Sequence, residues 1–205
     1  EASYWDYENL LKQMESDVHS IVGATGGVYA IRRQLYEPLP TTKAVTDDFL
    51  IPLNIITRWF RVKYDREARA YEKGSDSIGS EFRRKVRIGA QNFGTIPEFV
   101  SLLHPRHGFV AFALWSHKIL RWCVPFLLII MFASCIVLSY GNPLYRWFLW
   151  ATLGFIGVGI LGYVFEKFKI EVGMLTFPYY FLAMNAALFV GFVKFLFGKQ
   201  TLTWE

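Results

Sequence analysis

The sequence predicts a two-part chain in which a mixed α/β part facing water precedes an all-α transmembrane region with interfacial helices. The 205 residues are 53% hydrophobic and only 19% charged, more apolar than an ordinary globular protein. Of the 39 Lys, Arg, Asp and Glu residues, 29 lie in residues 1–106 and 10 in residues 107–205. Three uncharged runs in the second part approach the length of a bilayer-spanning helix.

This composition excludes disordered, collagen-like and disulfide-scaffold proteins. The net charge of +5 is compatible with nucleic acid, but the basic residues lack an interleaved aromatic pattern, so we expect a membrane and no nucleic acid as partner.

Cys123 and Cys135 both lie in an apolar stretch, where we expect free packing thiols. The first residues carry no initiator Met and no apolar leader, so we expect the chain to begin within a longer protein.

The first part alternates between helical and extended patterns. Apolar spacing predicts helices over Tyr4–Ser16, Asp47–Phe60 and Ser80–Asn92, and short apolar runs predict strands over Val28–Ile31 and Val62–Tyr64.

The second part divides into interfacial and spanning segments. We expect short amphipathic helices in the headgroup plane over residues 97–121, with Lys118 and Arg121 turned towards anionic lipid. Spanning helices are expected over about 122–140, 147–165 and 174–197.

The distribution of cations predicts the orientation of these spans. Arg106, Lys118 and Arg121 precede the first span, and Lys167 and Lys169 follow the second. The turn between these two spans carries Arg146 alone, so the positive-inside rule predicts a cytosolic N-terminal part. The last span would then leave residues 199–205 outside.

Two adjacent carboxylates, Asp47 and Asp48, follow Thr46 at the start of a predicted helix. They suit helix capping and the helix dipole. They equally suit a general base that removes a proton from an acceptor hydroxyl.

A dense basic cluster precedes the membrane and consists of Arg83, Arg84, Lys85 and Arg87. Guanidinium groups at this density bind a diphosphate or lipid headgroups, and the spacing does not separate the two uses. A small-residue loop, Gly23–Gly27, is either a tight turn or a place where an acceptor approaches the backbone closely. It lacks the spacing of a dinucleotide or P-loop motif, and the four histidines lack metal-ligand spacing.

Taken in order, these segments resemble the membrane-bound family 2 glycosyltransferases, which include cellulose, chitin and hyaluronan synthases and bacterial exopolysaccharide enzymes. The resemblance rests on GATGGVYAIRR (23–33), VTDDFLIPLNI (45–55), RVKYDREARAYE (61–72) and SEFRRKVRI (80–88), followed by interfacial and spanning helices. It implies residues 1–96 as the C-terminal half of a cytosolic GT-A-like domain, 97–121 as interfacial helices and 122–205 as the transmembrane region.

The resemblance also implies roles for individual residues. Asp48 matches the general base of an inverting enzyme, Asp47 the neighbouring acidic position of the acceptor site, and Gly26 and Gly27 the acceptor loop. In the family's Gln-x-x-Arg-Trp motif, Arg84 matches Arg and would bind the leaving diphosphate.

The cations Arg83, Lys85 and Arg87 would assist Arg84. Glu81 replaces the Gln of this motif, and Lys85 replaces the Trp that forms a sugar-stacking platform in processive synthases.

The implied reaction transfers a sugar from a nucleotide-sugar donor to a glycan or lipid-linked acceptor, in polysaccharide biosynthesis at a bacterial plasma membrane. A divalent cation, Mg²⁺ or Mn²⁺, would be held by an Asp-x-Asp motif upstream of residue 1, with no metal ligand in this chain. Residues 1–205 alone are therefore expected to be inactive. The alternatives are a polyprenyl-phosphate glycosyltransferase and a non-enzymatic membrane scaffold or transport subunit.

Overall fold

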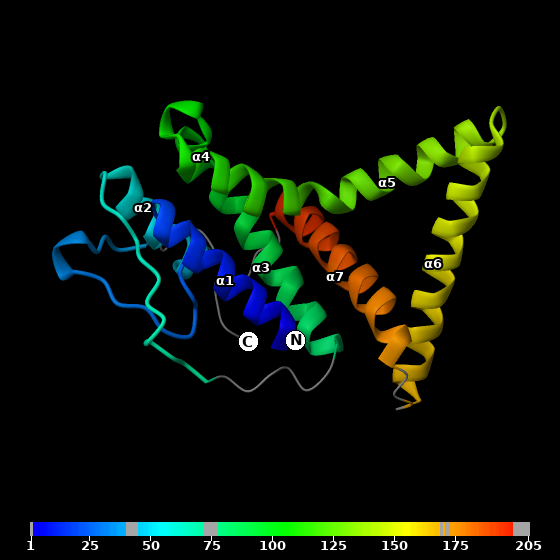
Figure 1. Ribbon diagram of the computed structural model, residues 1–205, viewed down its shortest axis with the longest axis horizontal. Helices are drawn as coiled ribbons and strands as arrows, with labels where there is room; N and C mark the ends of the chain where they lie inside the picture. Colours follow the sequence, from blue (N-terminus) through cyan, green and yellow to red (C-terminus); the bar gives the residue numbers. More distant parts are fainter. Residues whose placement is uncertain (1, 40–44, 72–77, 169, 171–172, 199–205) are drawn as a thin grey trace. The chain divides into compact units, whose positions relative to one another are not determined.

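The computed structural model describes residues 2–39, 45–71, 78–168, 170 and 173–198, and helices account for most of them (Figure 1). Contacts divide the chain into two compact units. The first comprises Glu1–Gly74, Gln91–Arg121 and Gly198–Glu205, and the second comprises Ser75–Ala90 and Trp122–Phe197. The expectations for Glu72, Lys169 and residues 199–205 lie outside the described residues.

The expected α/β class is wrong, because no β-strand occurs among the described residues and no GT-A-like sheet is built from them. At the first expected strand, Val28 forms only an isolated bridge with Thr25. At the second, the buried Ser20 and Ser16 hydroxyls accept hydrogen bonds from the N–H groups of Val62 and Tyr64, at 2.9 and 3.0 Å. The backbone N–H groups of Val62 and Tyr64 thus donate to serine side chains and not to the carbonyl groups of a neighbouring strand.

The predicted helices of the first part are confirmed. They are α1 (Ala2–Val18), α2 (Asp47–Thr57) and α3 (Ile78–Phe99), and they are followed by the 3₁₀ turns η2 (Val100–Leu103) and η3 (Pro105–His107) and by α4 (Phe109–Leu114). A further 3₁₀ turn, η1, covers Arg33–Leu35.

Helix α2 ends before the predicted Phe60 because Trp59 adopts a left-handed backbone with φ 64°. The N–H of Trp59 donates to the Ile56 carbonyl at 2.9 Å, and that of Phe60 donates to the Ile55 carbonyl at 3.2 Å. This pair of hydrogen bonds is a Schellman motif, which closes the helix.

The core of the first unit is apolar and gathers around α2. Phe49 meets Phe99 edge to face, with ring centroids 5.2 Å apart, and Leu53, Leu102 and Leu114 are almost completely buried. This packing holds the start of α2 in place, where Asp47 and Asp48 lie.

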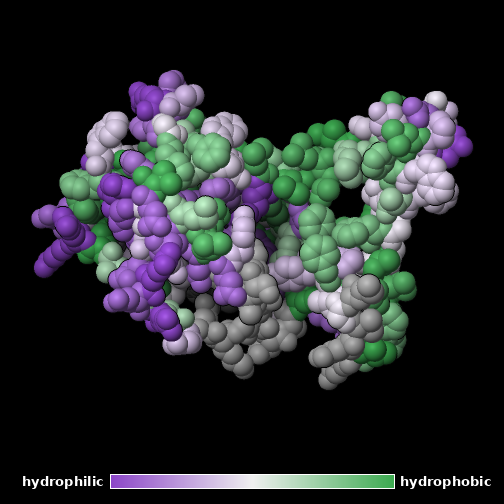
Figure 2. Space-filling model, in the orientation of Figure 1, coloured by the Kyte–Doolittle hydropathy of each residue, from purple (hydrophilic) through white to green (hydrophobic). Residues whose placement is uncertain are grey.

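The second unit contains α5 (Leu120–Ser139), α6 (Pro143–Lys167) and α7 (Gly173–Leu196). Three helical stretches are long and apolar enough to cross a membrane, namely Phe109–Ser139, Pro143–Lys167 and Leu175–Leu196. Figure 2 shows a largely hydrophobic surface over α5 and α6. The prediction of membrane-spanning helices is therefore confirmed at the level of length and composition. Cys123 and Cys135 are free thiols, as predicted.

Glycines allow close packing within the second unit. A Cβ built on Gly162 of α6 would lie 2.7 Å from the Leu175 carbonyl oxygen of α7, and one built on Gly191 of α7 would lie 2.8 Å from the Val86 carbonyl oxygen of α3. Close backbone approach at small residues is a common way of packing helices in membranes.

The first candidate span continues the expected interfacial helix without a break. Its 31 residues include a π-helical turn, η4 (Trp115–Ile119), between α4 and α5. About 20 residues cross the hydrocarbon core of a bilayer, so roughly ten residues of this stretch extend beyond it. The charged residues at its beginning indicate that these ten lie at the N-terminal end.

Candidate active site

The two carboxylates predicted as capping residues or base lie in the first turn of α2. Thr46 occupies the N-cap position without a capping hydrogen bond, because its hydroxyl donates to Asn92 Oδ1 at 2.9 Å. Asp47 accepts a hydrogen bond from the Tyr29 hydroxyl at 3.1 Å. The helix dipole favours negative charge on both carboxylates. Thr46 thus makes no capping hydrogen bond, and Asp47 is contacted by Tyr29. The Asp48 carboxylate accepts a hydrogen bond from its own backbone N–H, as the capping interpretation expects.

A proline in α2 explains how the glycine loop docks beside Asp48. Pro52 has no N–H, so the carbonyl of Asp48, four residues earlier, lacks its usual helical partner. The N–H of Ala24 donates to this carbonyl at 2.7 Å. The loop is therefore fastened to α2 at the residue predicted to be the base.

The loop is a tight turn, as one of its two interpretations predicts, and it also lies close to Asp48. The approach of an acceptor to its backbone stays a prediction. Val28 N–H donates to the Thr25 carbonyl at 3.2 Å and closes the turn. A Cβ built on Gly26 would lie 3.1 Å from Asp48 Oδ2, whereas one built on Gly27 would lie 3.6 Å from the Ala70 side chain. The structure thus brings Gly26 and Asp48 together and turns Gly27 towards another segment.

The carboxyl group of Asp48 is half-buried, and its surroundings alter its acidity. Burial raises the pKa of Asp48, and the neighbouring charge of Asp47 raises it further. The positive charges of Lys118 and Lys12 act in the opposite direction. A carboxylate whose pKa is raised is a stronger proton acceptor, which suits a general base.

Lys12 of α1 holds the other side of the loop. Its Nζ donates to Thr25 Oγ1 at 2.9 Å and to the Ala24 carbonyl at 3.4 Å. Burial lowers the pKa of Lys12, while the nearby carboxylates favour its charged form. The loop is consequently clamped between an ammonium group on α1 and the Asp48 backbone on α2.

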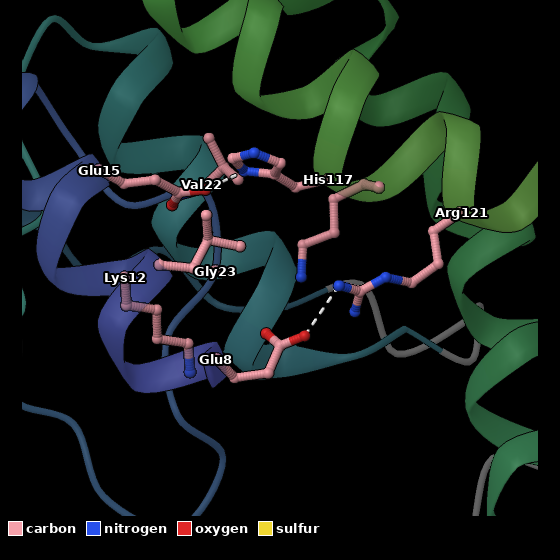
Figure 3. Close-up of a pocket in the computed structure, with 9 residues that line it drawn as sticks. Glu8, Lys12, Glu15, Val22, Gly23, His117 and Arg121 are labelled. Atoms are coloured by element: carbon pink, nitrogen blue, oxygen red, sulfur yellow. Dashed lines mark hydrogen bonds and ion pairs between the residues drawn. The ribbon is translucent and has the colours of Figure 1, made fainter. Parts of the chain in front are cut away.

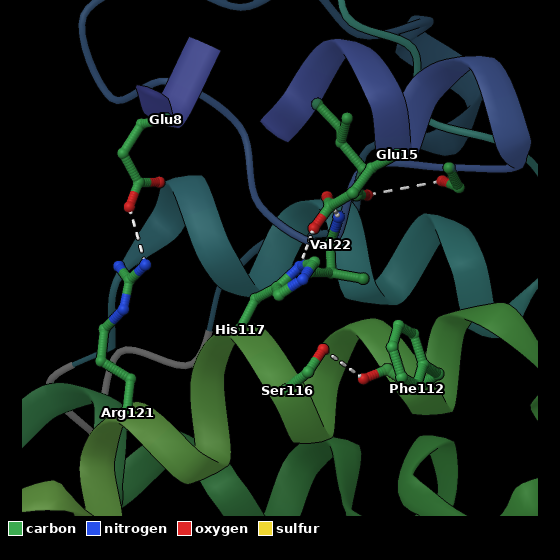
Figure 4. A network of polar contacts seen from close by, with 9 residues as sticks. Glu8, Glu15, Val22, Phe112, Ser116, His117 and Arg121 are labelled. Carbon is green, nitrogen blue, oxygen red and sulfur yellow. Dashed lines mark hydrogen bonds and ion pairs between the residues drawn. The ribbon is translucent and has the colours of Figure 1, made fainter. Parts of the chain in front are cut away.

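A small charged pocket adjoins this clamp (Figure 3). Arg121 Nη2 lies 2.8 Å from Glu8 Oε1, and His117 Nδ1 lies 2.5 Å from Glu15 Oε1. Figure 4 shows His117 and Arg121 directed at these two carboxylates of α1. The remaining oxygen of Glu15 accepts the N–H of Val22 at 3.3 Å. These contacts fasten α1 to the start of the helix that continues into the first candidate span.

Lys118 and Arg121, which we expected to face anionic lipid, both line this pocket instead. The Lys118 ammonium lies 5.4 Å from the centroid of the Phe49 ring and 3.4 Å from a Cβ built on Gly23. The π-helical turn contains His117 and Lys118, and π-turns shift the direction of side chains within a helix. Lys118 is therefore enclosed by the first unit, whereas Arg121 pairs with Glu8 and its side chain stays 42% exposed.

The predicted basic cluster lies on α3 in the second unit and is organised by one acid. Glu81 is buried, with its Oε1 3.5 Å from Lys85 Nζ and its Oε2 3.9 Å from Arg84 Nε. Arg83 is exposed and Arg87 is half-buried. Arg84 and Lys85, three and four residues after Glu81, thus share its side of the helix, and Arg83 lies on the solvent side.

A divalent cation such as Mg²⁺ or Mn²⁺ needs several ligands gathered at one point. The part of the chain that the structure describes contains no group of three or more His, Cys, Asp and Glu side chains that could hold a metal ion. The described residues therefore do not supply a site for the cation.

No family model, curated protein or solved structure matches the chain.

Proposed function

We propose that this chain is the acceptor-side and membrane-anchoring part of an inverting glycosyltransferase. It would act on a nucleotide-sugar donor and on a glycan or lipid-linked acceptor, in polysaccharide biosynthesis. The observation that supports this most is the position of Asp48, half-buried beside Gly26 with a raised pKa. The ordered motifs that resemble family 2 glycosyltransferases supply the reaction class.

In the proposed reaction, Asp48 takes the proton of an acceptor hydroxyl as the hydroxyl oxygen attacks the anomeric carbon. The new glycosidic bond forms while the bond between that carbon and the nucleotide diphosphate breaks, and the diphosphate leaves with the bonding electrons. Asp47, held by Tyr29, would shape the acceptor site, and Gly26 would let the acceptor approach. The resemblance alone implies that Arg84, with Arg83, Lys85 and Arg87, binds the diphosphate.

Donor and cation binding are assigned in this proposal to a part of the protein outside residues 1–205. The three apolar helices would anchor the enzyme, and the cations before the first and after the second of them favour a cytosolic N-terminal part. We therefore propose catalysis at the cytosolic face of a plasma membrane, bacterial by the same resemblance.

The test is the Asp48→Asn variant of the full natural protein in isolated membranes. We expect sugar transfer to fall by roughly a hundredfold to ten-thousandfold, the usual contribution of a general base, while donor binding is retained. Asp17→Asn is the matched control, because Asp17 is an exposed carboxylate on α1 of the same unit. Transfer is measured with a radiolabelled nucleotide sugar, and donor affinity by equilibrium binding.

Retained transfer by Asp48→Asn would exclude Asp48 as the base. A protein with no transfer activity, in which neither variant changes any property, would instead be a scaffold or transport subunit.

A further inference from the structure

The residue that follows α2 is an unexpected choice for its position. Trp59 is the left-handed residue of a Schellman motif, where glycine is usual because a side chain there is strained by about 1–2 kcal/mol. Its side chain is not buried in compensation, since Trp59 is 82% exposed. Since packing within this unit does not compensate for the strain, the exposed indole indicates a contact with a partner outside the unit.

An aromatic contact places Trp59 beside the segment that leads into α4. The Trp59 ring lies 5.9 Å from the imidazole of His107, two residues before α4 begins. On α4 and the following π-turn, Phe112 is 61% exposed and Trp115 is 47% exposed, while their neighbours Ala113 and Leu114 are buried. We call Trp59, Phe112 and Trp115 the aromatic patch.

The chemistry of the patch suits the boundary between lipid and water. The Trp115 indole N–H donates to the Leu103 carbonyl at 3.1 Å, so its polar edge is satisfied and its apolar rings face outward. Tryptophan is enriched at this boundary because one part of it is apolar and the other polar. Arg106 is an exposed cation next to His107 and suits anionic headgroups, whereas the exposed Arg58 next to Trp59 pairs with Glu37 at 3.3 Å.

Continuity with a candidate membrane span identifies the partner. Phe112 and Trp115 belong to the unbroken stretch Phe109–Ser139, and its first ten or so residues extend beyond the hydrocarbon core. His117 and Arg121 face Glu15 and Glu8 of α1, and Phe112 lies beside His117, with ring centroids 6.4 Å apart. Phe112 and Trp115 nevertheless keep about half or more of their surface exposed.

We propose that the aromatic patch is a lipid-contacting surface that inserts into the headgroup region of the bilayer and holds α2 against the membrane. The proposal does not depend on the glycosyltransferase function. It has a consequence for that function, because α2 begins with Asp47 and Asp48 and ends beside Trp59. Eleven residues of helix extend about 16 Å, so the carboxylates are held within about that distance of the anchored residue. An acceptor reaching Asp48 would then be one that lies close to the membrane surface.

The experiment places an environment-sensitive fluorophore on single cysteines of the full chain in lipid nanodiscs. Cys123 and Cys135 are first replaced by Ala, and the label is then introduced by Trp59→Cys or by Phe112→Cys. Tyr71→Cys is the matched control, because Tyr71 is an exposed aromatic residue, 92% accessible, outside the patch. In Figure 1 the segment that leads to it runs away from α4. Nanodiscs contain phosphatidylcholine and phosphatidylglycerol, with or without lipids brominated near the headgroup end of their acyl chains.

We expect blue-shifted emission and quenching by the brominated lipid at positions 59 and 112, and water-like, unquenched emission at position 71. Because all three side chains are exposed, the labels do not disturb the core, and the two patch positions check each other. Unquenched emission at 59 and 112 overturns the proposal, whether it is water-like or blue-shifted by a second copy of the chain. Equal quenching at all three positions also overturns it, because the contact would then not be specific to the patch.

Discussion

Gly26 lies so close to the Asp48 carboxyl group that adding a single methyl group there tests the candidate site. The loop is fixed on both sides, by the Ala24 hydrogen bond to the Asp48 carbonyl and by Lys12. A methyl group at Gly26 therefore cannot be accommodated by moving the loop alone. It would instead push the Asp48 side chain.

We expect Gly26→Ala to lower kcat by roughly tenfold to a hundredfold, because displacing a reacting group by a fraction of an ångström to 1 Å costs that much. The added Cβ would lie 3.1 Å from Asp48 Oδ2. Gly27→Ala is the control, since its Cβ would make an ordinary contact of 3.6 Å with Ala70. Steady-state kinetics of both variants check this. Equal activities would show that Gly26 does not limit the position of Asp48.

The sequence predicts some of these residues and not others. Asp48 and the glycines are visible as an acidic pair at a helix start and as a small-residue loop. The role of Lys12 could not be predicted, because a lysine among other charged residues of a helix is expected to face water. Only the fold brings its ammonium group to a loop twelve residues away. Pro52 is recognisable in the sequence as a residue that interrupts helical hydrogen bonds. Which N–H group then binds the Asp48 carbonyl depends on the fold.

At the scale of elements, helices were predictable and strands were not. Apolar spacing located α1, α2 and α3, although α1 buries Glu15 and Ser16 and exposes Tyr7, Leu10 and Met14. That inverted arrangement cannot be read from periodicity, which assigns the apolar side to the core. The strand predictions failed because short apolar runs do not reveal whether a backbone partner is present.

The packing of α6 against α7 gives a prediction at the same scale. Gly162→Ala would place a Cβ 2.7 Å from a carbonyl oxygen of α7, so we expect a loss of about 1–3 kcal/mol and a lower midpoint of thermal unfolding in detergent. Gly157→Ala on the same helix is the control, because nothing lies within 4 Å of its Cβ. The midpoint is measured by the rate of reaction of a thiol dye with Cys123 and Cys135 during heating. An unchanged midpoint for Gly162→Ala would contradict this close packing.

At the scale of the whole molecule, the chain combines a helical unit carrying the candidate base with a unit made mainly of apolar helices. The sequence shows a charged first part and an apolar second part, because the charged residues are concentrated in the first 106 positions. The boundary between the observed units was not predictable, because Ser75–Ala90, which includes the basic cluster, groups with the apolar helices. The partners of the charged side chains at 117–121 were not predictable. A basic segment before a span normally indicates lipid headgroups, whereas here it binds the carboxylates of α1.

The acidity of Asp48 depends on several elements of the first unit. Asp47 and the buried setting on α2 raise its pKa, and Lys12 of α1 and Lys118 of the π-turn lower it. A general base acts in its deprotonated form, so transfer must fall as the pH drops through this pKa. Ordinary aspartates have a pKa of about 4. The acid limb of the pH profile should therefore lie at a higher pH than that.

The most direct measurement is kcat as a function of pH for the wild-type protein, Lys12→Met and Lys12→Arg in membranes. Removing the positive charge of Lys12 raises the pKa of Asp48, so the account predicts that the acid limb of Lys12→Met moves to higher pH. Lys12→Arg keeps the charge and should retain the wild-type limb even if its overall rate is lower. An acid limb that stays at the same pH in Lys12→Met, or the absence of any acid limb in the wild type, would contradict Asp48 as the proton acceptor.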